Sequence, residues 1–154
     1  MRAFAVFLFC LYLATPARAE TVFVATLDGQ SNVPPTAAVT ATGMATFTLN
    51  DAQTELAYHI EYAGLSSDEI ASHVHVGNPR ENGPVAFALP VGSPKDGVWE
   101  ITPEHVANLL AGELYVNVPT QAYVSREIRG NIVDDEVSAQ EITWGRLKAR
   151  YRTR

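Results

Sequence analysis

The chain has 154 residues, with 17 acidic and 11 basic side chains and a formal net charge of −6. This length is typical of one domain, and the acidic balance disfavours nucleic acid, whose binders carry a basic face. The charge is uneven, because residues 20–133 hold 13 acids and 4 bases, whereas the last nine residues hold 5 bases. The only cysteine, Cys10, excludes an internal disulfide.

The first nineteen residues have the features of a signal peptide. Arg2 provides a positive start, residues 4–14 form an apolar run, and Ala17 and Ala19 place small residues at a cleavage site. The apolar run is shorter than the roughly 20 residues that span a bilayer. We therefore predict a signal peptide over residues 1–19, cleavage near Ala19, and export to the periplasm or the exterior.

The rest of the chain has the pattern of short β-strands. Residues 54–63 alternate most clearly, with Leu56, Tyr58 and Ile60 on one face and His59 on the other. The expected strands are 21–28, 42–50, 54–63, 70–76, 84–89, 98–101, 113–118 and 126–134. Short strands separated by turns predict an all-β sandwich or barrel.

One short helix is expected near residues 103–111. Thr102 suits the N-cap, Pro103 suits the first helical position, and Gly112 suits the position just past the end. An apolar stripe spaced i, i+3, i+4 begins at Val106. We expect this helix to bridge two sheets.

His73 and His75 are two residues apart on an expected strand, so both side chains leave the same face. Two imidazoles placed in this way can begin a copper or zinc site, which needs three or four ligands. In the alternative interpretation, both histidines form hydrogen bonds to neighbouring loops at the rim of a sheet. The sequence leaves the two interpretations open.

Two separated blocks carry a resemblance to a known family. The first reads HVHVG at 73–77 and NGPV at 82–85, and the second reads YVNVPT at 115–120 and EIRGN at 127–131. Together they resemble the CHRD family, a domain first recognised as a repeat in chordin and found in secreted bacterial proteins. The resemblance implies an immunoglobulin-like or Greek-key β-sandwich over residues 20–134, and it implies no well-defined reaction.

This chain departs from the family pattern at two positions. The second block of the family usually ends in Asn-Val-His-Thr, where the histidine is a candidate third ligand, but this chain has Pro119. The family also usually has a glycine where this chain has Arg126. His59 is a candidate substitute ligand, and the alternative is that it faces solvent. Asp68 and Glu81 are carboxylates that could complete the shell instead.

Asn117 and Arg129 lie on adjacent terminal strands in the family pattern, which implies an architectural role. A buried arginine can hold carbonyl oxygens, or a carboxylate such as Glu127 or Glu61, through bidentate hydrogen bonds. Contact with an anion or a partner protein is the alternative.

A more distant resemblance links the stretch from Gly64 to His75 to the copper-strand region of copper-zinc superoxide dismutase, which is also a β-sandwich. The dinuclear site of that family uses six histidines and one aspartate, and this chain has four histidines. The family's disulfide also has no counterpart in the mature chain. The likeness is one of fold, and we expect no dismutase activity.

The C-terminal segment 135–154 forms a basic tail. Its five bases, between Arg146 and Arg154, share one parity, so a strand would present them on a single face. The tail is either a solvated terminus, a segment that docks on the acidic body, or a contact to an anionic surface.

The sequence therefore predicts an exported, non-enzymatic binding or accessory protein of the cell envelope or exterior. Its partner would be a protein or a small ligand, and not nucleic acid. The chain itself is expected to have no transmembrane segment. The alternative is a mononuclear copper or zinc protein built on His73 and His75.

Overall fold

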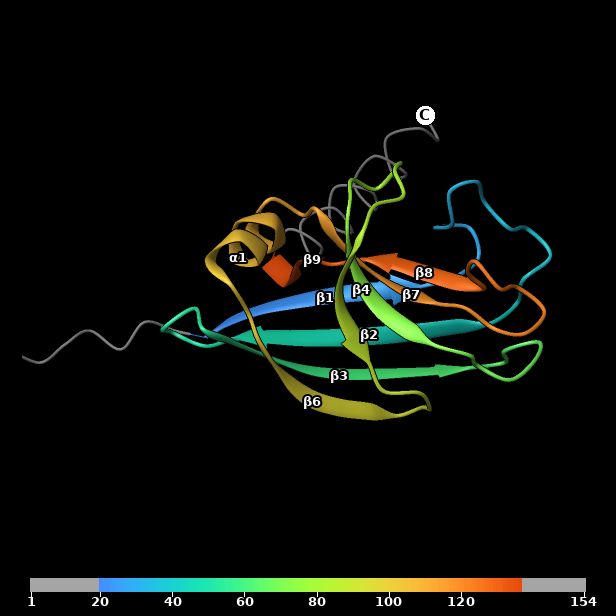
Figure 1. The fold of residues 1–154 in the computed structure, drawn as a ribbon, viewed down its shortest axis with the longest axis horizontal. Coiled ribbons are helices and arrows are strands. Elements are labelled where there is room, and N and C mark those ends of the chain that lie inside the picture. Colours follow the sequence, from blue (N-terminus) through green and yellow to red (C-terminus); the bar gives the residue numbers. More distant parts are fainter. Residues whose placement is uncertain (1–19, 137–154) are drawn as a thin grey trace, which may run out of the picture.

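Figure 1 shows the computed structural model, which describes residues 20–136. The predicted signal peptide and the basic residues 146–154 lie outside the described residues. Two antiparallel sheets pack face to face, and the predicted all-β sandwich with one short helix is confirmed. Within residues 20–136, no helix is long and apolar enough to cross a membrane.

The strands divide five to four between the sheets. Sheet A has the order β6–β3–β2–β1–β9, and sheet B has the order β5–β4–β7–β8. Sheet A consists of β1 (Thr21–Leu27), β2 (Thr42–Leu49), β3 (Glu55–Ala63), β6 (Lys95–Glu100) and β9 (Val133–Asp134). Sheet B consists of β4 (Ser72–Val76), β5 (Val85–Leu89), β7 (Leu114–Val118) and β8 (Ile128–Asn131).

The core lies between the sheets and follows the alternation of the strands. On β3, Leu56 and Ile60 are fully buried and His59 is exposed, as the pattern predicts. On β4, Val74 is fully buried, so His73 and His75 lie on the outer face of sheet B. Burying such side chains stabilises the domain by about 1.5–3 kcal/mol each.

Helix α1 (Pro103–Leu110) lies between β6 and β7 in the chain, where the sequence predicts it. The side chain of Thr102 accepts a hydrogen bond from the His105 backbone nitrogen at 3.3 Å, which caps the helix. Gly112 follows the helix with a φ of 71°.

Most strand boundaries agree with the sequence prediction within two residues, and two strands differ more. Strand β6 begins at Lys95 rather than at residue 98, although Gly97 lies within it. The predicted strand 126–134 divides into β8 of sheet B and β9 of sheet A. The chain changes sheets at Ile132, which is fully buried, while the nearby Gly130 leaves room for the Thr26 carbonyl.

A buried ion pair joins the two sheets near one edge. Lys95 Nζ of β6 lies 2.7 Å from Glu69 Oε1 and 2.9 Å from the Ser72 hydroxyl of β4. Glu69 also accepts hydrogen bonds from the Tyr62 hydroxyl and the Gly92 backbone nitrogen. Burial raises the pKa of Glu69, but the hydrogen bonds from Lys95, Ser72 and Tyr62 outweigh it, so the net pKa is lowered.

Replacing one member of this pair should cost more than replacing both. Lys95→Met leaves a buried carboxylate, so we expect a loss of about 3–5 kcal/mol in the free energy of unfolding. The double variant Lys95→Met/Glu69→Gln should regain at least half of the loss. Urea unfolding measures both effects, with Arg80→Met as a control on an exposed base.

The same pair predicts acid sensitivity. Because the net pKa of Glu69 is lowered in the folded state, its contribution to stability is lost as the pH falls below the usual glutamate range near about 4.3. The Glu69→Gln variant should show a weaker acid dependence than the native protein. In the urea experiment, an equal loss of stability in Lys95→Met and in Lys95→Met/Glu69→Gln would contradict a coupled pair.

Candidate functional site

The two sequence blocks meet on the outer face of sheet B. In the strand register, His73 of β4 lies opposite Asn117 of β7, which lies opposite Arg129 of β8. In the next row, His75 lies opposite Tyr115. Residues as far apart in the sequence as His73 and Arg129 therefore form one polar layer on this face.

The centre of this layer is a stack of three side chains. The His75 ring lies parallel to the Tyr115 ring, with centroids 5.0 Å apart and an interplanar angle of 10°. The Arg129 guanidinium carbon lies 3.6 Å from the Tyr115 ring centroid, within the range of a cation–π interaction. Arg129 is fully buried, and burial lowers its pKa while Tyr115 opposes that shift.

The stack holds the β4–β5 loop, residues 77–84, against the sheet. Arg129 donates to the carbonyl oxygens of Glu81 and Asn78, each at 2.9 Å. His75 Nδ1 lies 2.9 Å from the Gly83 carbonyl oxygen, and the Gly83 nitrogen donates to the Tyr115 hydroxyl at 3.1 Å. A Cβ at Gly83 would lie 1.7 Å from the Val76 carbonyl oxygen, so only glycine fits there.

Arg129 thus holds carbonyl oxygens, one of the two kinds of acceptor that the sequence offers. The carboxylates Glu127 and Glu61 do not serve it. Glu127 accepts from the Ser66 nitrogen at 2.7 Å and from the Thr120 hydroxyl at 2.7 Å, and Glu61 lies exposed on sheet A. Burial and these contacts support the architectural role that the family pattern implies for Arg129.

Asn117 has a similar role toward a second loop. Its side chain is 7% exposed, and its amide nitrogen donates to the Ser125 carbonyl oxygen at 3.1 Å. This contact anchors the β7–β8 loop, residues 119–127, to sheet B.

The histidine pair has part of the geometry that a metal site needs. The ring centroids of His73 and His75 are 5.7 Å apart. Because the Gly83 carbonyl can only accept, His75 Nδ1 must carry the proton, and Nε2 then holds the lone pair in the neutral ring. That Nε2 is buried and has no hydrogen-bond partner among residues 20–136. Burial also lowers the pKa of His75, which favours the neutral form.

The structure does not bring His59, the candidate third ligand, to this pair. His59 lies on the outer face of sheet A, where its Nδ1 is 2.6 Å from Asp96 Oδ1, and this hydrogen bond raises its pKa. Since His73 and His75 face outward from sheet B, His59 points to the opposite side of the sandwich. Among residues 20–136, no group of three or more His, Cys, Asp or Glu side chains is placed to hold a metal ion.

Neither of the two carboxylates that could complete the shell forms a group of three metal-binding side chains with the histidine pair among residues 20–136. The Glu81 carboxylate accepts from the Asn78 side chain at 2.9 Å. The Asp68 side chain is exposed, and its carbonyl oxygen accepts from the Gln121 nitrogen at 3.0 Å.

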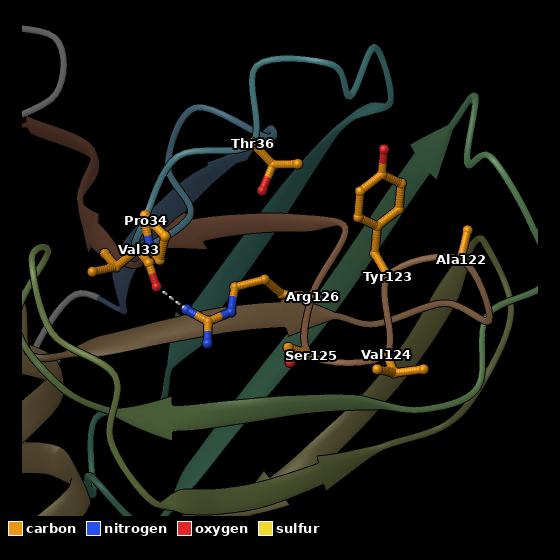
Figure 2. A pocket seen from close by; sticks show the side chains of 8 residues that line it. All are labelled: Val33, Pro34, Thr36, Ala122, Tyr123, Val124, Ser125 and Arg126. Atoms are coloured by element: carbon orange, nitrogen blue, oxygen red, sulfur yellow. Dashed lines mark hydrogen bonds between the residues drawn. The ribbon is translucent and has the colours of Figure 1, made fainter.

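Sequence reasoning missed a cavity of about 350 Å³ beside this layer. It lies between the β1–β2 connection and the β7–β8 loop, as Figure 2 shows. The lining residues are Val33, Pro34, Thr36, Ala122, Tyr123, Val124, Ser125 and Arg126. The available signals were two polar, turn-rich segments and the basic residue at a position where the family usually has glycine.

The basic side chains of the domain gather around this region. Residues 20–136 contain 16 acids and 4 bases, and three of those bases are Arg80, Arg126 and Arg129. Arg80 lies in the loop that Arg129 holds, and Arg126 lines the cavity. Among the described residues, neither Arg126 nor Arg129 has a carboxylate oxygen within 4.0 Å. Loop 77–84, the cavity lining and Arg129 together hold these three bases and one acid, Glu81, on a domain that is otherwise acidic.

Arg129→Lys should destabilise the domain, although the charge is kept. A lysine cannot donate to the Glu81 and Asn78 carbonyls together, and it has no planar group to lie over the Tyr115 ring. We therefore expect a loss of about 2–4 kcal/mol in the free energy of unfolding. Urea unfolding measures the loss, and hydrogen exchange should show faster exchange at Gly83. The exposed Arg80→Lys is the control, and equal stability of the two variants would contradict the role of Arg129.

Comparison with known proteins agrees with the two sequence blocks. The family model described as CHRD domain matches residues 23–132, which includes both blocks and all strands of sheet B. No curated protein and no solved structure matches the chain. The chain belongs to the CHRD domain family.

Proposed function

We propose that this protein is an exported, non-enzymatic binding domain of the cell envelope or exterior, and that it binds through the loops on sheet B. The observation that carries this proposal is that residues of the two family blocks hold two loops in place. His75, Tyr115 and Arg129 are directed at holding loop 77–84, and Asn117 holds the β7–β8 loop. The sandwich thus acts as a scaffold that fixes two loops beside a cavity.

The fixed loops support binding because loops that are already ordered lose less conformational entropy when a ligand binds. In the β7–β8 loop, the Tyr123 nitrogen donates to the Thr120 hydroxyl at 3.2 Å, and the Ala122 nitrogen donates to the Ser67 hydroxyl at 2.8 Å. Binding residues commonly lie on loops that a rigid scaffold positions.

A loop replacement tests this proposal. We expect the exported protein to bind saturably to the envelope fraction of the cells that produce it, measured by co-sedimentation. Replacing residues 122–125 by Gly-Ser-Gly-Ser should reduce retention at least fivefold, because it removes the side chains that line the cavity. Replacing the exposed turn 51–53, at the far end of β2, should leave retention unchanged.

A truncation separates the loops from the basic tail. Removing residues 142–154 should release the protein from anionic vesicles if the tail binds an anionic surface. Retention that needs the tail but not residues 122–125 would contradict binding through the loops.

The second candidate is a mononuclear copper or zinc protein. One observation favours it: the buried lone pair on His75 Nε2, in a ring oriented by the Gly83 carbonyl, as metal-bound histidines commonly are. In this case His73 and His75 would hold the ion, which would be stored, carried or sensed. Since Nε2 is buried, binding would require the surrounding side chains to shift.

Metal content distinguishes this candidate. Elemental analysis and competition titration with copper and zinc should find one ion per chain, and His73→Ala/His75→Ala should lose it. His59→Ala, on the other sheet, is the matched control and should keep the ion. The same metal content in the double variant would exclude the pair as ligands.

A further inference from the structure

Both walls of the cavity beside the β7–β8 loop are held by buried hydrogen bonds. The Asn32 side chain, which is 1% exposed, donates to the Thr36 hydroxyl at 3.1 Å and to the Glu127 carbonyl at 2.8 Å. It therefore ties the wall that contains Thr36 to Glu127, the last residue of the β7–β8 loop and the neighbour of Arg126. The cavity is formed before any ligand enters it.

Two donors are directed to this cavity. The Thr36 hydroxyl already accepts from Asn32, so its own proton remains to donate. Arg126 Nη1 donates to the Val33 carbonyl and the Asn82 side chain, which fixes the guanidinium. Its Nε and Nη2 groups make no hydrogen bond to any residue between 20 and 136. Figure 2 shows Thr36 and Arg126 on facing sides of the hollow.

No carboxylate among residues 20–136 lies within ion-pair distance of Arg126. The neighbouring carboxylate, Glu127, is fully buried and accepts from Ser66 and Thr120 instead. The lining contains no acidic residue. A guanidinium with two open donor groups beside a hydroxyl is complementary to an anionic oxygen group.

The remaining walls favour an apolar body beside that group. Val33, Pro34 and the Tyr123 ring line the cavity, and Val124 is 70% exposed at its edge. A volume of about 350 Å³ lies at the lower end of the range for small-molecule sites.

The geometry points to a small-molecule site that takes a carboxylate or phosphate group on a short apolar or aromatic body, with Arg126 and Thr36 as its donors. This inference rests on the proposed function and names the ligand class of the same loops. The anionic group binds the Arg126 guanidinium, and the apolar body lies against Pro34, Tyr123 and Val124.

Nuclear magnetic resonance titration of the purified exported protein tests the ligand class. The probes are 3-phenylpropionate, phenyl phosphate, inorganic phosphate and the neutral 3-phenylpropionamide. At least one aromatic anion should bind tenfold more tightly than the amide and than inorganic phosphate, with shifts at residues 33–36 and 122–126. Comparing the affinities of the two aromatic anions tells whether the site prefers a carboxylate or a phosphate.

Matched variants separate the cavity from the general positive charge. Arg126→Gln should weaken binding of the preferred anion at least tenfold. Arg80→Gln removes the same charge from an exposed loop site and should change the affinity less than twofold. Val124→Glu adds a repelling charge at an exposed position and should also weaken binding tenfold. Val98→Glu makes the same change at an exposed position of sheet A and should have no effect.

Several outcomes would overturn the inference. These are equal binding of the amide and the anions, equal losses in Arg126→Gln and Arg80→Gln, or unchanged binding in Val124→Glu. If these occur while residues 122–125 still determine retention on the envelope, the proposed binding function stands and only the ligand class is wrong. If Arg126→Gln does not fold, the two valine variants decide the question.

Discussion

A buried guanidinium determines how the outer face of sheet B is built. Arg129 is a permanent cation without solvent contact, and burying such a charge is costly unless its donors are satisfied. The acceptors of its Nη1 and Nη2 groups all belong to loop 77–84, and the guanidinium also lies over the ring of Tyr115. The loop therefore cannot leave the sheet without leaving the charge unpaired, and the positions of His75 and Gly83 follow from it.

The domain has two interiors of different chemistry. Between the sheets, Phe23, Phe47, Leu56 and similar side chains exclude water in the ordinary way. On the outer face of sheet B, polar side chains and backbone groups are buried with each other. The first interior makes the sandwich stable, and the second fixes which loops lie over it. Because the residues of the second interior are occupied with this task, they are poor candidates for direct ligand contact.

The strands and the helix were predictable because their signals are local. Alternation on 54–63 and the cap at Thr102 each need only neighbouring residues. Alternation gives the face of a residue but not its sheet. It could not show that His59 lies on sheet A while His73 and His75 lie on sheet B, although all three face outward. The Arg129 stack depends on strand register, and the cavity depends on a contact between Val33 and Arg126, 93 positions apart. Neither the stack nor the cavity can be predicted from a local sequence pattern.

The cavity walls combine a fixed backbone with freely exposed side chains. Asn32, Asn117 and Glu127 hold the main chain from within, while Ala122, Val124 and Ser125 are exposed and bury little surface. We therefore expect that substitutions at these three positions can accumulate without unfolding the domain. Such a surface can diversify rapidly during evolution, as antibody loops do on their own β-sandwich. The same property makes this domain a scaffold for selecting new binders from libraries randomised at those positions.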